Sequence, residues 1–315
     1  MTNLDEQLQG VQSVGIAGHV RPDGDCVGSC LATYNYIRTY YPEIDVQLFL
    51  EPIPNIFKFM ANSEQIISEC KKEMLFDLFL ALDCGDTERL GEAAKYFENA
   101  KSTICIDHHI SNQAFAKENY IYPHASSTCE LVFELLGTDK ITKSIAECLY
   151  TGIVHDTGVF QYSCTSAKTM NIAGILMEKK IDYSKIIDET FYTKTFAQNQ
   201  ILGQALIDSK LYLNGKTIAS TVTAEMMKEY DVLPKHLDGI VSQLRVTKGV
   251  EVAIFLYETG DGTFKVSARS NGDVNVADIA MLFGGGGHAK AAGFSMTGTK
   301  EEIIELVNKE IEKQL

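Results

Sequence analysis

The chain has 315 residues, a length that suits two domains, and 45% of them are hydrophobic, which excludes a disordered protein. Its 28 Lys and Arg against 42 Asp and Glu give a net charge of −14, which disfavours long duplex nucleic acid as a partner. No apolar stretch approaches the roughly 20 residues of a membrane span, and MTNLDEQLQG lacks the pattern of a signal peptide. We therefore expect a cytoplasmic protein that does not bind membranes.

The cysteines of this chain are expected to be free thiols. There are 8 of them, and none forms a C-x-x-C pair. Disulfides are rare in a reducing compartment, and a thiolate zinc site normally shows paired spacing. The sequence thus argues against both a disulfide framework and a zinc site made of thiolates.

The first half of the chain alternates strand-like and helix-like segments. Apolar runs predict strands over residues 13–20, 45–50, 76–83 and 102–107, and apolar spacing predicts a helix over 27–41 that stops before a proline. Such β-α-β alternation is typical of an α/β fold with a doubly wound, mostly parallel sheet. We expect it to form a first domain.

The second half begins with helix and then changes character. Residues 166–210 look mostly helical, and we expect 191–210 to be a helical linker after a first domain of 1–190. From 211 onward, Asn-Gly in LYLNGKTIASTV and TGDGT in VEVAIFLYETGDGTFKVSARS each predict a β-hairpin. Residues 211–315 should therefore form a smaller mixed α/β domain.

Carboxylates and imidazoles follow the predicted strands of the first domain. They are His19, Asp23 and Asp25 after the first strand, Asp83 after the third, Asp107, His108 and His109 after the fourth, and Asp156 after a later apolar stretch. In open α/β sheets, ligands bind beyond the carboxyl ends of the strands. Asp and His also suit turns and caps, which explains any one group but not their convergence.

Clustered carboxylates repel one another, and a bound cation offsets that repulsion. Donors that combine imidazole and carboxylate suit Mn²⁺ or a similar divalent ion. The number of donors at this sheet edge suits two ions rather than one.

A glycine run in the second half, FGGGGHAKAAGF, follows the amphipathic stretch NVADIAMLF. Glycines let the backbone approach a ligand closely and turn its N–H groups toward an anion, and His288 follows at once. The alternative is an ordinary helix C-cap with a flexible loop. Arg269 ends a predicted strand nearby in the sequence, and a guanidinium there could bind a phosphate.

These motifs resemble a known family. GHVRPDGDCVGS, ALDCGD, IDHHISN and GIVHDTGVF are similar, in the same order, to the four motifs of the DHH phosphoesterases. FGGGGHAKAAGF, preceded by ARS, resembles the DHHA1 domain that follows in that family. The resemblance is strongest to the bacterial nanoRNase and pAp phosphatase branch. It implies that 1–190 is a DHH metal-binding catalytic domain and that 211–315 is a DHHA1 substrate-binding domain.

The resemblance also implies roles for individual residues. His19 and Asp23 would bind one metal ion, Asp25, His108 and Asp156 the other, and Asp83 would bridge the two. His109 would face the substrate, and Asp107 would fix the histidines by hydrogen bonding. The expected substrate contacts of the second domain are Arg269, Ser270, Gly284, Gly285, Gly286, Gly287 and His288.

The expected activity is hydrolysis of short oligonucleotides, nanoRNA or dinucleotides such as pApA, to mononucleotides, and of pAp to AMP. Two ions, expected to be Mn²⁺, would generate a hydroxide nucleophile, and His109 would assist the departing 3′-oxygen. Two alternatives stay open, a manganese-dependent pyrophosphatase and a non-catalytic, metal-dependent nucleotide-binding regulator. The expected partners are short RNA or DNA oligonucleotides, dinucleotides or pAp, and the sequence leaves a homodimer open.

Overall fold

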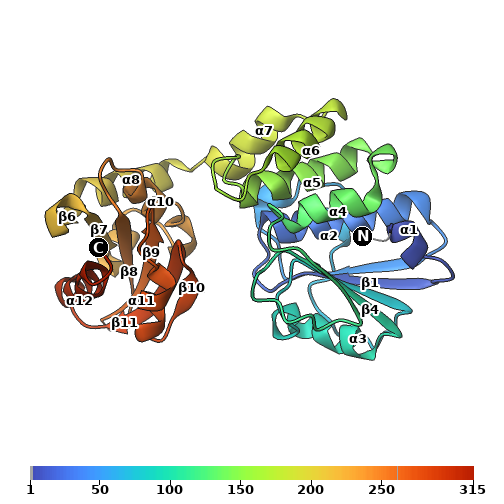
Figure 1. The fold of residues 1–315 in the computed structure, drawn as a ribbon, viewed down its shortest axis with the longest axis horizontal. Coiled ribbons are helices and arrows are strands. Elements are labelled where there is room, and N and C mark those ends of the chain that lie inside the picture. Colours follow the sequence, from blue (N-terminus) through green and yellow to red (C-terminus); the bar gives the residue numbers. More distant parts are fainter. Residues whose placement is uncertain (1–2, 261) are drawn as a thin grey trace. The chain divides into compact units, whose positions relative to one another are not determined.

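The computed structural model describes residues 3–260 and 262–315. The chain forms two compact units, a first that ends at Thr193 and a second over Lys194–Leu315 (Figure 1). Each unit has its own sheet, and the predicted α/β class is confirmed. Within the described residues, no helix has both the length and the apolar character needed to cross a membrane.

The sheet of the first unit has five strands, all parallel, in the order β2-β1-β3-β4-β5. The strands are β1 (Ser13–Ala17), β2 (Asp45–Phe49), β3 (Leu78–Leu82), β4 (Ser102–Asp107) and β5 (Glu118–Ile121). The first four lie where apolar runs predict them. Strand β2 lies on one side of β1 and β3 lies on the other, so the strand order reverses between β1 and β3. Open α/β sheets bind ligands at such a topological switch point.

Helices cover both faces of this sheet (Figure 1). The helices of this unit are α1 (Leu4–Gln7), α2 (Gly24–Tyr40), α3 (Ala94–Asn99), α4 (Thr128–Leu136), α5 (Lys143–Asp156), α6 (Ala167–Glu178) and α7 (Tyr183–Ile187), with 3₁₀ turns at Asn55–Phe57, Ser63–Gln65, Glu88–Ala93 and Thr138–Lys140 and a π-helical turn at Asp188–Tyr192. Apolar residues of α2, α4 and α5 form one core with the sheet. Phe79, Tyr96 and Phe97 belong to a smaller core on the opposite face, beneath α3. Strands β1, β3 and β4 are thus buried on both sides, as their apolar sequences require, whereas β5 at the sheet edge is only partly buried.

The second unit is built on a mixed sheet with the order β10-β11-β9-β8-β7-β6, in which only β7 and β8 run parallel among the described strands. The strands are β6 (Lys210–Tyr212), β7 (Thr217–Val222), β8 (Val252–Gly260), β9 (Thr263–Ser270), β10 (Gly286–His288) and β11 (Ala291–Thr297). Both predicted hairpins form, β6 with β7 and β8 with β9. Asp261, part of the TGDGT stretch predicted as a turn, lies outside the described residues.

Helices also cover both faces of the second sheet. They are α8 (Phe196–Ile207), α9 (Ala224–Glu229), α10 (Ile240–Arg245), α11 (Val276–Leu282) and α12 (Lys300–Glu312), with 3₁₀ turns at Leu213–Gly215 and Pro234–His236. Ile201 and Ala205 of α8 are fully buried in the core of this unit. The helix that the sequence predicts as part of a linker is therefore built into the second unit.

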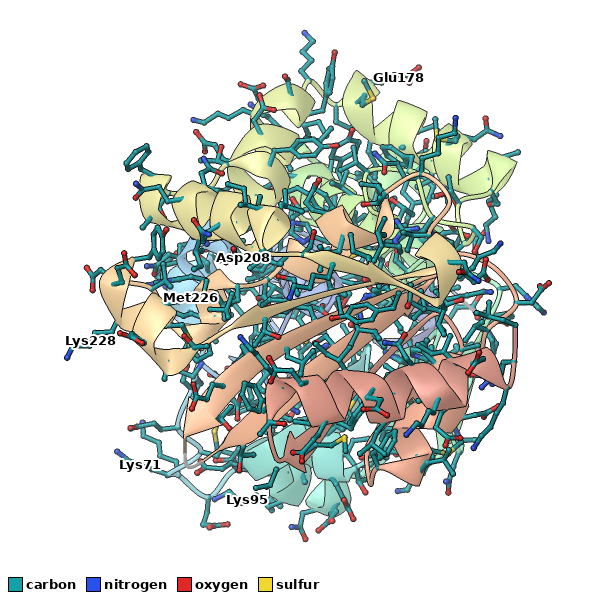
Figure 2. All side chains as sticks on the ribbon, turned by 90° about the vertical axis from the view of Figure 1, so that its left-hand side faces the viewer. Lys71, Lys95, Glu178, Asp208, Met226 and Lys228 are labelled. Carbon is teal, nitrogen blue, oxygen red and sulfur yellow. The ribbon has the colours of Figure 1, made fainter. Side chains whose placement is uncertain are left out.

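A cavity of about 510 Å³ opens beside β6, β7 and α12 in the second unit. Asp208 and Met226, both labelled in Figure 2, are among the residues that line it. None of the residues predicted for the functional site lines this cavity.

Candidate metal centre

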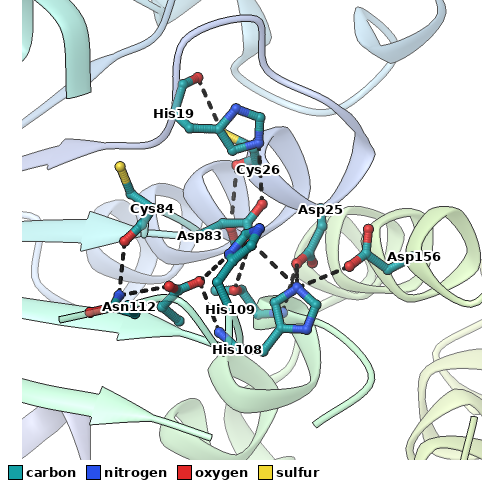
Figure 3. Close-up of polar contacts among 12 residues, drawn as sticks. His19, Asp25, Cys26, Asp83, Cys84, His108, His109, Asn112 and Asp156 are labelled. Carbon is teal, nitrogen blue, oxygen red and sulfur yellow. Dashed lines mark hydrogen bonds and ion pairs between the residues drawn. The ribbon is translucent and has the colours of Figure 1, made fainter. Parts of the chain in front are cut away.

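The predicted donors of the first unit meet beyond the carboxyl ends of β1, β3 and β4. His19 comes two residues after β1, Asp83 directly follows β3, and Asp107 is the last residue of β4. Figure 3 shows the side chains of His19, Asp83 and His108 directed toward one another. Asp156, the last residue of α5, reaches the same place.

The N-terminus of α2 holds two acids in different surroundings. Asp23 is its N-cap, and its Oδ1 accepts hydrogen bonds of 3.1 Å from the N–H groups of Asp25 and Cys26. Asp25 is fully buried, and its oxygens accept from the N–H groups of Thr128 at 2.6 Å and Cys129 at 2.9 Å. These donors open α4, whose N-terminal dipole also favours a carboxylate. Backbone donors therefore fix both carboxylates in place.

Asp83 stands at the centre of the cluster. One oxygen, Oδ2, lies 3.5 Å from Nε2 of His19, while Oδ1 lies 3.7 Å from Nε2 of His108 and 3.7 Å from Nδ1 of His109. The Thr128 hydroxyl donates to Oδ1 at 3.0 Å. The two oxygens of one carboxylate thus face different histidines.

Three overlapping groups of side chains could hold a cation among the described residues: His19, Cys26 and Asp83; Asp83, His108 and His109; and Asp25, His108 and Asp156. In each group the donor atoms lie within 4.8 Å of one another. Asp83 and His108 each belong to two groups. Nitrogen and carboxylate donors so close together fit divalent cations well.

Asp23 and Cys26 differ from the expected donor set. Asp23 is absent from the three groups, although its Oδ2 lies 3.5 Å from Nε2 of His19. Cys26 is present, although the sequence predicts no thiol at the site. It falls inside the apolar-looking run DCVGSC, so only the tertiary structure reveals that its sulfur faces the donors.

The charges of the cluster shift the pKa values of its members. Burial opposes the protonation of His19, but hydrogen bonds with Asp23 and Asp83 outweigh it and raise the pKa of His19 to about 12. In the same way, burial opposes protonation of His108, but neighbouring carboxylates, Asp156 foremost, raise its pKa to about 10. Burial raises the pKa of Asp156 to about 6. Protons and cations therefore compete for the same atoms.

Asp107 organises the pair of histidines. Its Oδ1 accepts from the His108 N–H at 2.8 Å and lies 2.6 Å from Nδ1 of His109. Its Oδ2 accepts at 2.6 Å from the amide of Asn112, which also donates to the Cys84 carbonyl at 3.0 Å. The sequence assigns no role to Asn112, although it ends the IDHHISN motif. Because Nδ1 of His109 is engaged by Asp107, Nε2 is the ring nitrogen left for a further contact.

The predicted substrate residues of the second unit lie on β9 and around β10. Arg269 and Ser270 end β9; the Arg269 guanidinium donates to the Ala268 carbonyl at 3.0 Å, and Ser270 is buried. The Gly284 and Gly285 N–H groups donate to the carbonyls of Met281 and Ala280, so they close α11.

Gly286 to His288 then form β10, an edge strand paired antiparallel with β11. The glycine run is thus a helix C-cap followed by a strand, and His288 is exposed. Close packing explains two of the glycines, because a Cβ would lie 2.3 Å from the Gly293 carbonyl oxygen at Gly285 and 2.4 Å from that of Ala291 at Gly287.

Two family models match parts of the chain. The model of the DHH family N-terminal domain matches residues 13–153, and that of the DHHA1 domain matches residues 214–313. The chain therefore carries a DHH family N-terminal domain followed by a DHHA1 domain. It is therefore a phosphoesterase, a hydrolase that cleaves phosphate esters, as the sequence motifs predict.

Several relatives cover nearly the whole chain. It is 28% identical over 321 residues to the bifunctional oligoribonuclease and PAP phosphatase NrnA of Thermus thermophilus, covering 99% of this chain and 94% of that protein. The Bacillus subtilis protein of the same name is 28% identical over 301 residues, covering 94% and 93%. The crystal structure of an exopolyphosphatase-related protein from Bacteroides fragilis superposes with a TM-score of 0.91 at 28% identity, covering 98% of this chain and 94% of that one.

Proposed function

We propose that this protein hydrolyses short oligonucleotides, dinucleotides such as pApA included, to mononucleotides, and pAp to AMP, at a centre of two divalent cations. The observation that carries the proposal is the convergence of His19, Asp83 and His108 with buried acids at the switch point of the sheet. The names of the relatives support the choice of substrate.

The donor groups suggest how two cations would be held. His19 and Asp23 would hold one, Asp25, His108 and Asp156 would hold the other, and Asp83, with an oxygen toward each side, would serve both. Burial and the neighbouring Asp83 and Asp156 raise the pKa of Asp25, so a bound cation would favour its ionised form. When bound, such ions polarise a phosphate and make water a better nucleophile near neutral pH; the proposed ions are Mn²⁺.

His109 would act on the substrate itself. Its hydrogen bond with Asp107 raises the pKa of His109, which favours the protonated ring. With Nδ1 fixed by Asp107, the ring would present an N–H at Nε2 to the departing 3′-oxygen and donate its proton as the P–O bond breaks. Asn112 and the Asp107 carboxylate would keep the ring in that orientation.

Residues of the second unit would bind the substrate's phosphate end. Arg269 and Ser270 at the end of β9 and His288 on β10 supply the polar groups, and β11, which pairs with both strands, joins them in one sheet. Only part of the glycine run is available for an anion, because Gly284 and Gly285 use their N–H groups to close α11.

The test is hydrolysis of a substrate panel with Mn²⁺, followed by chromatography of the products. The panel contains dinucleotides to pentanucleotides, pAp, linear pApA, cyclic di-AMP and inorganic pyrophosphate. Release of mononucleotides from the short chains is the expected result, and the Asp83→Asn variant is the control for contaminating nucleases. Cleavage of pyrophosphate alone would favour the pyrophosphatase, and Mn²⁺-dependent nucleotide binding without turnover would favour the regulator.

A further inference from the structure

Cys26 places a thiol among the donors of the metal centre. Its Sγ belongs to one group with His19 and Asp83, in which all ligand atoms lie within 4.8 Å of one another (Figure 3). The residue is fully buried, in the first turn of α2. Its sulfur packs against Gly18, which directly follows β1, so closely that a Cβ there would lie 2.3 Å from the sulfur.

The donor set of this group is one nitrogen, one carboxylate and one sulfur. Zinc and cadmium bind thiolates strongly, whereas Mn²⁺ favours oxygen and nitrogen donors. Zn–S and Zn–N bonds of about 2.3 and 2.0 Å in tetrahedral geometry separate such donors by about 3.5 Å. Donors already within 4.8 Å therefore need only small side-chain rotations to close on one ion. The Asp23 carboxylate lies 3.5 Å from Nε2 of His19 and could supply a fourth donor atom to the same ion.

We propose that Cys26 is a metal ligand on the His19 side of the centre, and that it makes this side take up thiophilic ions of the zinc and cadmium class in competition with Mn²⁺. The inference rests on the metal centre of the proposed function and adds its metal selectivity. The thiol proton passes to solvent as the sulfur–metal bond forms.

The experiment titrates the metal-free protein with Cd²⁺ and records the ultraviolet sulfur-to-cadmium charge-transfer band. Cys26→Ser and Cys26→Ala remove the ligand, and Cys30→Ser is the matched control, because Cys30 is a fully buried thiol one turn later in α2 that belongs to no donor group. The wild type and Cys30→Ser should show the band, and both Cys26 variants should lack it.

Competition with a chromophoric chelator then gives the affinities for Zn²⁺ and Mn²⁺. Zn²⁺ affinity should fall at least about 10-fold in Cys26→Ser, while Mn²⁺ affinity stays within about 3-fold, since the nitrogen and oxygen donors remain. Preserved Mn²⁺ binding also shows that the variant is folded.

The inference is overturned if the band persists in the Cys26 variants or disappears in Cys30→Ser. An equal loss of Zn²⁺ and Mn²⁺ affinity in both Cys26 variants would make the thiol a packing residue and would also overturn it. None of these measurements uses a nucleotide. A protein that shows the Cys26-dependent band but hydrolyses no member of the substrate panel would refute the proposed function and leave this inference standing.

Discussion

Asp83 reaches the centre through an unusual backbone conformation. Its φ is +55°, in the left-handed region that disfavours most residues with a side chain but that Asp and Asn tolerate best. This turn directly after β3 brings the carboxylate between His19 and His108. Replacements at this position should therefore keep both the side-chain length and the tolerance for that φ.

We predict that Asp83→Asn lowers kcat/KM by at least about 100-fold without unfolding the protein, because the shared carboxylate would be lost while Asn keeps the left-handed turn. Asp83→Ala should be equally inactive but less stable. The measurements are steady-state kinetics on pApA and thermal unfolding. Retention of more than a tenth of the rate in Asp83→Asn would rule out the shared role.

Asp107→Asn tests whether this acid positions His109 rather than binding metal. We expect kcat to fall by about 10–100-fold, because the ring loses the partner that fixes its orientation, while the manganese content stays unchanged. Steady-state kinetics give kcat, and elemental analysis of the same preparation gives the manganese content. Loss of manganese in proportion to activity would mean that Asp107 supports the ligands directly.

At this scale the sequence predicts which side chains converge better than it predicts their hydrogen-bonding partners. His19, Asp83 and His108 are recognisable because each follows an apolar strand. Asn112 and Thr128 are not, because their contacts with Asp107 and Asp83 depend on how separate segments meet. Cys26 is hidden for another reason, since a thiol in an apolar run is usually a core residue.

Among the elements, α1 is too short to be stable alone and is held by Asp5. The Asp5 carboxylate accepts hydrogen bonds from the hydroxyls of Tyr36 and Tyr41 and pairs with Lys140. Burial opposes the charge, but these partners outweigh it and lower the pKa of Asp5. The cluster joins α1 to α2 and to the turn after α4.

We predict that Asp5→Asn lowers the free energy of unfolding by about 1–3 kcal/mol at pH 7. The folded pKa lies below the unfolded value of about 3.9, so this stabilisation is present above that pH and is lost as the pH falls through the folded pKa. Urea unfolding at pH 7 and pH 3 should show the difference shrinking in acid. Asp139→Asn, at an exposed position, is the control and should change stability by less than about 0.5 kcal/mol at either pH. A difference of the same size at both pH values would contradict the charge-based explanation.

On the edge strand β10, His288→Ala should raise KM for dinucleotides and leave the metal content intact. The residue is exposed and lies in the second unit, which supplies none of the proposed metal ligands. Some fall in kcat is also expected, since remote binding energy helps to orient the reacting phosphate. Kinetics on a dinucleotide and on a small nitrophenyl phosphate diester separate the roles. Equal losses on both substrates would place His288 at the reacting phosphate.

The elements that the sequence predicts well are those with strong periodic patterns. Strands β1 to β4 are continuous apolar runs, so they are visible locally. Strand β5, whose sequence is ENYI, is only partly buried at the sheet edge and shows no such run. The sequence predicts an anion-binding glycine run, with a helix C-cap and flexible loop as the alternative, and neither predicts β10, which forms because β11 supplies its hydrogen-bonding partner across a tight turn.

For the whole molecule, cation loading should govern both stability and activity. We predict that chelation with EDTA abolishes activity and lowers the Tm, and that Mn²⁺ restores both better than Ca²⁺, which prefers shells made only of oxygen. Saturation at 100 times the Kd would stabilise the protein by about 2.7 kcal/mol. Calorimetry with each ion, and with Asp83→Asn as the control, measures the effect. Equal rescue by Ca²⁺ would contradict the assignment of His19 and His108 as ligands.

The spread of the donors along the chain sets an order of events during synthesis. His19 and Asp83 belong to early segments, whereas Asp156 closes α5 and leaves the ribosome last of the proposed ligands. At 5–20 residues per second, His19 precedes Asp156 by roughly ten seconds. A nascent chain that extends past Asp83 already contains the residues of the group of His19, Cys26 and Asp83, whereas the group of Asp25, His108 and Asp156 is complete only once Asp156 is added. All residues of the His19 side are therefore synthesised before the other side is complete, and we expect the His19 side to be the first that can bind a cation.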